Sequence, residues 1–280
     1  AELTGADLSG VDLSGVDLSG VDLTDTDLTD TDLTDADLSG SILKGTIFGA
    51  TLSKAVLIEV VLAGVDLAGV DLTGADLSGI DLSGIDLTGV DLTGADLSGT
   101  DLTGTNLNLA ILDRADLDGA VLTNTSFYQA SLRSVDLSDQ VVDAKDLSFA
   151  DLSGADLSGV DLSDRKMEAV LLRNADLSRA NLSGAFLGGS GLLAAETMDL
   201  DLKYWDVPEE DRSDLSGANL QGANLTGVNL VVANLTGADL TSADLTGADL
   251  TGANLTGADF TGVDLTGADL TGAVLTDTDL

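Results

Sequence analysis

Residues 6–10 read Ala6-Asp7-Leu8-Ser9-Gly10, and this five-residue unit recurs almost from one end of the chain to the other. If the Leu is position i, a small apolar residue precedes it at i−2 and Asp or Asn at i−1. Ser or Thr follows at i+1 and Gly at i+2. A period of five fits neither the 3.6 residues of a helical turn nor the alternation of a free strand. The pattern therefore predicts a chain that turns a corner in every repeat.

Each repeat is expected to point the residues at i−2 and i into a core and to turn at the Ser/Thr-Gly pair. Gly at i+2 suits a type II turn, in which one residue needs a positive φ. Asp replaces Gly at this position in Asp25, Asp30 and Asp35. We expect a different turn there, because Asp adopts a positive φ less readily than Gly.

The 53 repeats fall into three blocks, which span residues 3–48, 52–192 and 215–280. Position i holds Leu almost throughout, and Phe48 is assigned to position i at the end of the first block. Phe48 and Leu52 are four residues apart, so the register slips by one residue between them. We expect a single β-helical solenoid over 1–280, with a register slip near 48–52 and a non-repeat loop over about 194–212.

The A(D/N)LxG motif, repeated over nearly the whole chain, resembles the pentapeptide-repeat family. The resemblance implies an all-β fold, the right-handed quadrilateral β-helix, in which four repeats make one coil. Coils about 4.8 Å apart then number about 13 and extend over roughly 63 Å. The fluoroquinolone-resistance members, which this chain resembles at family level, bind DNA gyrase and are understood to mimic DNA on its basic surface. They often carry Phe at position i, where Leu dominates here.

The chain carries a formal net charge of −38, from 49 acidic and 11 basic residues. Along the expected coils this is one net charge per about 1.7 Å, the axial charge spacing of duplex DNA. Such acidity disfavours nucleic acid and anionic membranes as direct partners and favours a protein with a basic surface, such as a type II topoisomerase. Alternatively, Asp at i−1 keeps an apolar solenoid soluble or adapts the protein to high salt.

No catalytic site is expected. The sequence contains no His and no Cys, which excludes a Ser-His-Asp triad, a Cys nucleophile and the usual zinc sites. Catalytic carboxylate pairs need a concave, desolvated site, which a regular convex coil does not supply. We therefore predict a non-enzymatic protein without a cofactor or a bound metal. No apolar run approaches the ~18 residues of a membrane span and the N-terminus lacks a signal-peptide pattern, so we expect a cytoplasmic location.

Stacked coils are expected to align carboxylates at 20-residue intervals, about 4.8 Å apart. One such row, the predicted acidic ladder, consists of Asp76, Asp96, Asp116, Asp136, Asp156 and Asp176. Each rung offers one carboxylate and no cage, which favours diffuse counterions over a specific Ca²⁺ site.

Residues 105–212 break the monotony of the repeats, and we expect a central face there that binds a partner. Its candidate residues are Leu109, Tyr128, Phe149, Phe186, Arg114, Arg133, Arg173, Tyr204 and Trp205. Exposed aromatic side chains rimmed by Arg are typical of protein interfaces. The alternatives are that the loop with Tyr204 and Trp205 covers this face, or that these residues are scattered surface positions.

Two functions follow from these patterns. The first is a DNA mimic that binds or inhibits a DNA-binding enzyme such as gyrase. The second is a structural spacer or scaffold, or a fragment of a longer repeat protein, whose copies assemble through the central face.

Overall fold

The computed structural model describes residues 3–45, 47–62, 65–67, 69–138, 143–144, 146–188 and 212–279. The chain divides into two compact units, Ala1–Val135 and Asp136–Leu280. A single solenoid over 1–280 therefore stays a prediction, and each unit is described by itself. Tyr204 and Trp205, with most of the predicted loop, lie outside the described residues.

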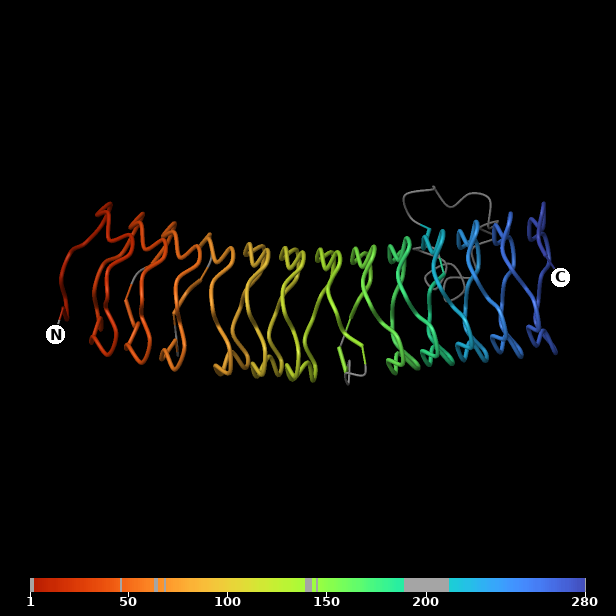
Figure 1. The fold of residues 1–280 in the computed structure, drawn as a ribbon, viewed down its shortest axis with the longest axis horizontal. Helices are drawn as coiled ribbons and strands as arrows, with labels where there is room; N and C mark the ends of the chain where they lie inside the picture. The colour runs from red at the N-terminus through yellow and green to blue at the C-terminus, as the bar shows by residue number, and fades with distance from the viewer. Residues whose placement is uncertain are drawn as a thin grey trace, which may run out of the picture. The chain divides into compact units, whose positions relative to one another are not determined.

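Each unit is a succession of coils joined by parallel β-bridges (Figure 1). The bridges pair residues 20 apart, such as Asp7 with Asp27 in the first unit and Asp244 with Asp264 in the second. Four repeats therefore complete one coil, as the family resemblance implies. Among the described residues there is no helix, and no strand is longer than one bridge residue, because every repeat ends in a turn.

The core of each unit is filled by the residues at positions i and i−2. Leu28, Leu102 and Leu250 are fully buried, as are Ala95 and Ala253. Burying one Leu side chain contributes about 1.5–3 kcal/mol. The repeated Leu column is therefore the main source of stability, and the prediction that Leu lies inside is confirmed.

The corners keep one geometry even where Gly is replaced. The N–H of residue i+3 donates to the carbonyl oxygen of residue i, and Gly10 at i+2 has a φ of 67°. The expectation of a different turn at Asp25, Asp30 and Asp35 is wrong, because their φ values are 58°, 55° and 57°. Hydrogen bonds to the adjacent coil hold these corners in place, and they outweigh the roughly 1–2 kcal/mol cost of a left-handed residue with a Cβ.

The register breaks one repeat earlier than predicted. Ile47 is 1% exposed, whereas Phe48 is 62% exposed, so Ile47 holds position i and Phe48 lies outside. The short repeat runs from Leu43 to Ile47, and bridges across it pair residues 19 apart, as in Asp32 with Thr51. Counting five residues from Leu43 led to Phe48, because an apolar pattern does not show a residue missing inside the corner.

The shortened corner depends on Gly45. A Cβ at this position would overlap the backbone carbonyl oxygen of Thr26 in the preceding coil. Unlike the glycines at regular corners, Gly45 does not have a positive φ. Glycine is therefore required here by the close approach of the two backbones and not by the geometry of the turn.

Candidate partner-binding surfaces

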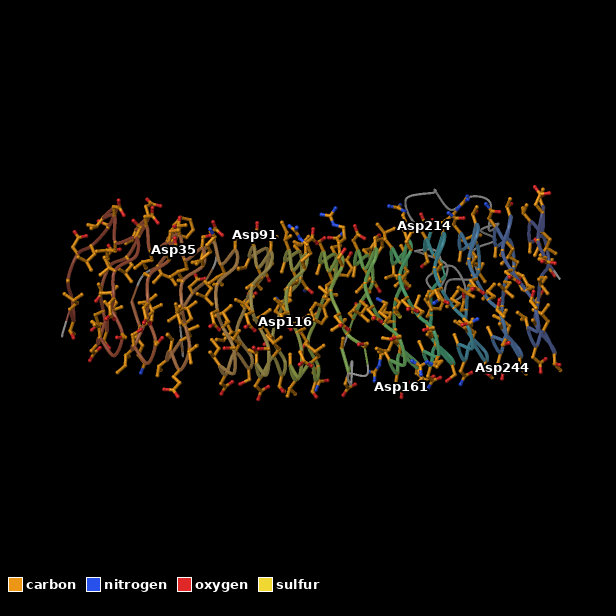
Figure 2. The ribbon with its side chains drawn as sticks, in the orientation of Figure 1. Asp35, Asp91, Asp116, Asp161, Asp214 and Asp244 are labelled. Carbon is orange, nitrogen blue, oxygen red and sulfur yellow. The ribbon has the colours of Figure 1, made fainter. Side chains whose placement is uncertain are left out.

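The predicted acidic ladder is divided between the two units. Parallel bridges join its residues in two sets of three: Asp76, Asp96 and Asp116 in the first unit, and Asp136, Asp156 and Asp176 in the second. Figure 2 shows labelled aspartates of several ladders on the outside of the coils. Each unit by itself therefore presents rows of carboxylates one coil apart.

The carboxylate at i−1 has a structural role that does not require its charge. Oδ1 of Asp7 accepts the backbone N–H of Ser9 at 3.1 Å, an Asx turn that leads into the corner. Oδ1 of Asn234 accepts the N–H of Thr236 in the same way, at 3.2 Å. Nδ2 of Asn234 also donates to Oδ1 of Asp214 in the adjacent coil, at 3.0 Å. Asn thus serves the fold at least as well as Asp, and the fold alone does not explain the excess of Asp.

Hydrogen bonds within the repeats lower the pKa of several of these carboxyl groups. The hydroxyl of Ser163, followed by its backbone N–H, holds the pKa of Asp161 below its usual value. Ser138 lowers the pKa of Asp136 through the same two contacts. The Asx turn therefore favours the ionised form of the side chain that makes it.

Four of the predicted partner-binding residues lie together in the first unit. The N–H of Leu109 donates to the carbonyl of Tyr128 at 2.9 Å, and that of Arg114 to the carbonyl of Arg133 at 2.9 Å. Ile111 lies between Leu109 and Arg114, where most repeats carry Asp. Leu109 is 52% exposed, Ile111 is 38% exposed and Tyr128 is half-buried. These residues belong to two successive coils. We call the set the apolar patch, after its three apolar and aromatic members; it consists of Leu109, Ile111, Tyr128, Arg114 and Arg133.

The apolar patch lacks the usual Asp acceptors, and side chains of the preceding coil replace them. Ser126 occupies i−1 before Tyr128, and Oδ1 of Asn108 accepts both the Tyr128 N–H, at 3.0 Å, and the Ser126 hydroxyl, at 2.7 Å. At the next corner Asp113 accepts the Arg133 N–H at 3.2 Å and pairs with its guanidinium at 2.7 Å. The two repeats of Tyr128 and Arg133 therefore lack a carboxylate at i−1, and the backbone N–H groups of both residues still have acceptors.

Asp113 is ionised within this arrangement. Burial alone would raise the pKa of Asp113, but hydrogen bonds from Ser131 and Arg133 outweigh burial and lower the pKa. Arg133 is thus neutralised within the chain. Arg114 is exposed and forms no ion pair with any described residue.

The other described candidates, Phe149, Phe186 and Arg173, belong to the second unit. Phe149 occupies a corner with a φ of 61°, and Phe186 lies on a side, bridged to Lys166. Both side chains are half-buried, so they project less than the sequence predicts. Lys166 itself lies 3.6 Å from a carboxylate oxygen of Asp146.

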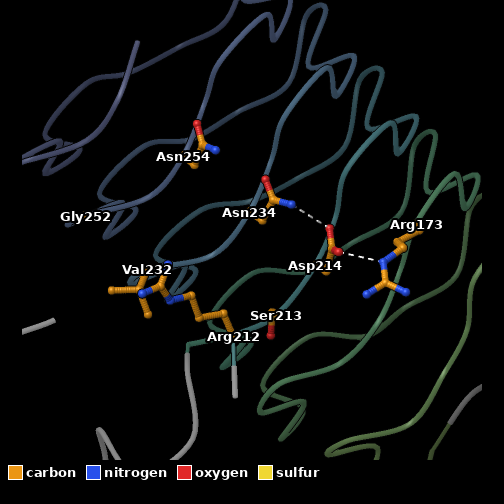
Figure 3. A pocket seen from close by; sticks show the side chains of 8 residues that line it. All are labelled: Arg173, Arg212, Ser213, Asp214, Val232, Asn234, Gly252 and Asn254. Atoms are coloured by element: carbon orange, nitrogen blue, oxygen red, sulfur yellow. Dashed lines mark hydrogen bonds and ion pairs between the residues drawn. The ribbon is translucent and has the colours of Figure 1, made fainter. Parts of the chain in front are cut away.

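Arg173 borders a hollow of about 350 Å³ around Asp214 (Figure 3). Nε of Arg173 lies 2.6 Å from Oδ2 of Asp214, and Asn234 donates to Oδ1. Burial would raise the pKa of Asp214, but hydrogen bonds from Arg173 and Ser216 outweigh it and lower the pKa. Both carboxylate oxygens are therefore engaged within the chain.

The sequence interpretation missed a coil without acid in the second unit. All four of its i−1 positions carry Asn: Asn219, Asn224, Asn229 and Asn234. Bridges place it between the coil of Asp176 and the coil of Asp239. The signal was visible in the sequence as a run of Asn at a position that is usually Asp. This neutral coil interrupts the acidic rows of the second unit.

Two further observations concern metals and membranes. Within the described ranges, no three or more Asp or Glu side chains are grouped so as to hold a metal ion. The same part of the chain contains no helix with the length and hydrophobicity that crossing a membrane requires.

Comparison with known proteins extends the likeness found in the repeats. A family model described as pentapeptide repeats matches eight segments, residues 1–40, 47–84, 71–108, 110–139, 146–164, 165–190, 213–252 and 243–280. No curated protein sequence matches the chain significantly.

Three solved structures are similar to this chain. HetL, a pentapeptide repeat protein involved in heterocyst differentiation regulation in the cyanobacterium Nostoc, is 31% identical, over 98% of this chain and 90% of HetL, with a TM-score of 0.26. A pentapeptide repeat protein of the Arabidopsis thaliana thylakoid lumen is 30% identical over 50% of this chain and 68% of its own, with a TM-score of 0.23. QnrB1, a plasmid-mediated fluoroquinolone resistance protein, is 16% identical over 71% of this chain and 92% of QnrB1, with a TM-score of 0.28. On the family model and the repeats it matches, this chain belongs to the pentapeptide-repeat family.

Proposed function

We propose that this protein is a non-enzymatic binding protein whose carboxylates occupy the basic surface of a DNA-binding protein in place of duplex DNA. One observation carries the proposal: Asp fills most i−1 positions, although Asn makes the same Asx turn and an additional bond to the preceding coil. Rows of like charge repel one another. Charge beyond what the fold needs is expected where a partner recognises it.

The density of this charge supports mimicry of DNA. Over residues 71–86 every side carries Asp, so four carboxylates lie within one coil rise of about 4.8 Å. Duplex DNA carries one charge per about 1.7 Å, and this coil carries one per about 1.2 Å. Such a surface attracts a basic partner and competes with DNA for it. The family resemblance favours a type II topoisomerase such as gyrase as that partner.

Recognition also needs features that do not repeat. Sliding an acidic row by one coil restores nearly the same pattern, so the rows provide attraction and fast encounter but little register. In the first unit Ile111 interrupts one row, since it is bridged to Asp91, and Leu109 and Tyr128 lie at corners nearby. We propose that the apolar patch fixes the position of the partner.

The proposal includes three points taken from the sequence. The coils follow a right-handed course, they number about 13 at about 4.8 Å each, and the protein acts in the cytoplasm. Neither a cofactor nor direct contact with nucleic acid is part of this function.

Inhibition of gyrase supercoiling, measured together with binding at low and high salt, tests the proposal. Replacing Asp76, Asp96 and Asp116 by Asn removes three charges from one row and retains the Asx acceptors. The matched control replaces Asp25, Asp30 and Asp35 by Asn, which removes three charges at corners. Weaker inhibition by the row variant than by the corner variant supports recognition of the rows. Failure of the unaltered protein to bind at about 0.05 M salt, where screening is weak, contradicts the proposal.

A scaffold that assembles through the apolar patch is the second candidate. It is favoured by the exposed Leu109 and Ile111 beside an Arg133 that is already neutralised. The variant Leu109→Gly with Ile111→Asp restores the usual residues of the repeat and removes the exposed apolar side chains. If copies associate through this patch, sedimentation equilibrium shows dissociation of this variant. Equal masses for both proteins exclude such assembly.

A further inference from the structure

One side of the second unit carries little charge. Parallel bridges join the i−1 residues of five successive coils on this side, and we call them the low-charge row: Leu171, Asp214, Asn234, Asn254 and Val274. Its single carboxylate, Asp214, is paired with Arg173. The other three sides of the last two described coils each carry two carboxylates: Asp239 and Asp259, Asp244 and Asp264, and Asp249 and Asp269. A second acidic protein therefore meets the least repulsion at the low-charge row.

Both ends of the low-charge row are apolar. Leu171 is half-buried and Val274 is 46% exposed, and each holds the outward i−1 position that usually carries Asp. Four coil spacings of about 4.8 Å place them about 19 Å apart. The bridges place Asn234 halfway between them. The row is therefore symmetric about Asn234 in the character of its ends.

Hydrogen-bonding groups next to Asn234 are complementary. Oδ1 of Asn254 accepts the N–H and the hydroxyl of Thr256, but its Nδ2 donates to no described residue. Oδ2 of Asp214 accepts Nε of Arg173 and has room for one more donor. Figure 3 shows Asp214, Asn234 and Asn254 in this order along the row. An unused donor and an acceptor thus lie one coil away from Asn234, on opposite sides of it.

Opposite charges flank the two ends of the row. Arg173 lies at the corner after Leu171, and its side chain is 49% exposed although it contacts Asp214. Asp277 lies at the corner after Val274, on the same edge of the side. Asp277 is exposed and forms no ion pair within the described ranges. A cation and an anion therefore stand at equal distances from the coil of Asn234.

We propose that two copies of this chain associate through the low-charge row, antiparallel to each other, about a two-fold axis that passes through Asn234. The axis places Leu171 against Val274 of the second copy, and Val274 against Leu171 of the second copy. A two-fold interface uses the same surface of both copies, so every contact occurs twice. The three more acidic sides of the last coils remain turned away from the second copy.

The same axis pairs the polar groups. Nδ2 of Asn254 donates to Oδ2 of Asp214 of the second copy, and Arg173 faces Asp277 of the second copy. The hollow of about 350 Å³ beside Asp214 leaves room for the incoming amide. This interface depends neither on DNA mimicry nor on the apolar patch of the first unit, so each of these proposals can fail alone.

Sedimentation equilibrium at about 0.15 M salt tests the proposal, and the unaltered protein should show twice the mass of the chain. Val274→Asp restores the usual residue of the repeat and places a carboxylate against Leu171. It should raise the dissociation constant of the dimer about tenfold or more. The matched control is Val121→Asp, the same change at an i−1 residue of the first unit that is 45% exposed, and it should dimerise normally. A single-chain mass for the unaltered protein, or equal weakening by both variants, overturns the proposal.

A pair of charge variants separates contact from general repulsion. Asp277→Arg places a cation opposite Arg173, whereas Asp35→Arg makes the same change in the first unit. Both positions are corners with φ values of 55° and 57°, and Arg179 shows that arginine fits such a corner, with a φ of 59°. Each variant lowers the net negative charge equally. Asp277→Arg should weaken the dimer and Asp35→Arg should not, and equal strengthening by both overturns the proposal.

Cross-linking locates the axis. The chain contains no Cys, so Asn234→Cys introduces one thiol per copy, on the axis. A short bis-maleimide should then join two copies. The matched control is Asn219→Cys on another side of the same coil, which loses the same Asx turn and should remain unlinked. Equal cross-linking of both variants, or none of Asn234→Cys, overturns the proposal.

Discussion

Asn108 accepts the backbone N–H of Tyr128 through Oδ1, 3.0 Å away in the next coil. In most repeats this donor bonds to Asp or Asn in its own repeat, but Ser126 occupies that place here. The acceptor is thus supplied by a residue 20 positions earlier.

Asn108→Ala should lower the free energy of unfolding by about 1 kcal/mol, because the Tyr128 N–H and the Ser126 hydroxyl lose their acceptor. Adding Ser126→Asp to this variant restores the acceptor within the repeat and should recover most of the loss. Urea denaturation of the two variants and the unaltered protein measures both effects. A double variant no more stable than Asn108→Ala would contradict this account.

Gly45→Ala should destabilise the protein more than a substitution at a regular corner. The new Cβ overlaps the carbonyl of Thr26, and overpacking of this kind costs about 1–3 kcal/mol or more. Gly79 has a φ of 67° and nothing within 4 Å of its Cβ position, so Gly79→Ala should cost only the roughly 1–2 kcal/mol of a left-handed residue. Thermal unfolding compares them, and a larger loss for Gly79→Ala would be inconsistent with a close approach at Gly45.

Asp161 separates the role of the Asx turn from that of charge. Its Oδ1 accepts the Ser163 N–H at 3.0 Å and Nδ2 of Asn181 at 2.9 Å. Asp161→Asn keeps an acceptor and should leave the unfolding temperature nearly unchanged. Asp161→Ala removes it and should lower that temperature by about 2–4 °C, the shift that about 1 kcal/mol produces in a domain of this size. Similar losses for both variants would show that the charge itself stabilises the coil.

Stability should fall in acid. The Ser hydroxyl and N–H bonds lower the pKa of Asp136 and Asp161 in the folded state, so the folded protein binds fewer protons than the unfolded chain. Their contribution is present above the unfolded pKa, about 3.9, and is lost as the pH falls through the lowered values. Urea unfolding between pH 6 and pH 3 measures the loss. Replacing Ser138 and Ser163 by Ala should reduce it, and stability that rises in acid would show that repulsion between carboxylates dominates.

The period of five predicts the core, because identical repeats impose identical geometry, and the family resemblance adds that four repeats make one coil. With four repeats to a coil, Leu109 and Tyr128 belong to successive coils, and the structure bonds them through the backbone. The count fails at Phe48, since Ile47 and Phe48 are both apolar and a residue missing from a corner leaves the hydrophobic pattern intact. The expectation of a different turn at Asp25 fails for another reason, because the local preference of Asp is overridden by a backbone bond to the next coil.

The candidate surfaces were less predictable than the core. Replacement acceptors such as Asn108 and Asp113 lie in a different repeat from the donors they serve, so their role depends on the stacking of coils.

The shortened corner at Gly45 has a consequence for folding. Coils of 20 residues are interchangeable, so a partly folded chain can pair a coil with the wrong neighbour and still align Leu with Leu. A coil of 19 residues, whose glycine alone fits beneath Thr26, has one partner only. Pairing of this coil therefore fixes which coils lie on either side of it, and the order of the coils that pair later follows from that.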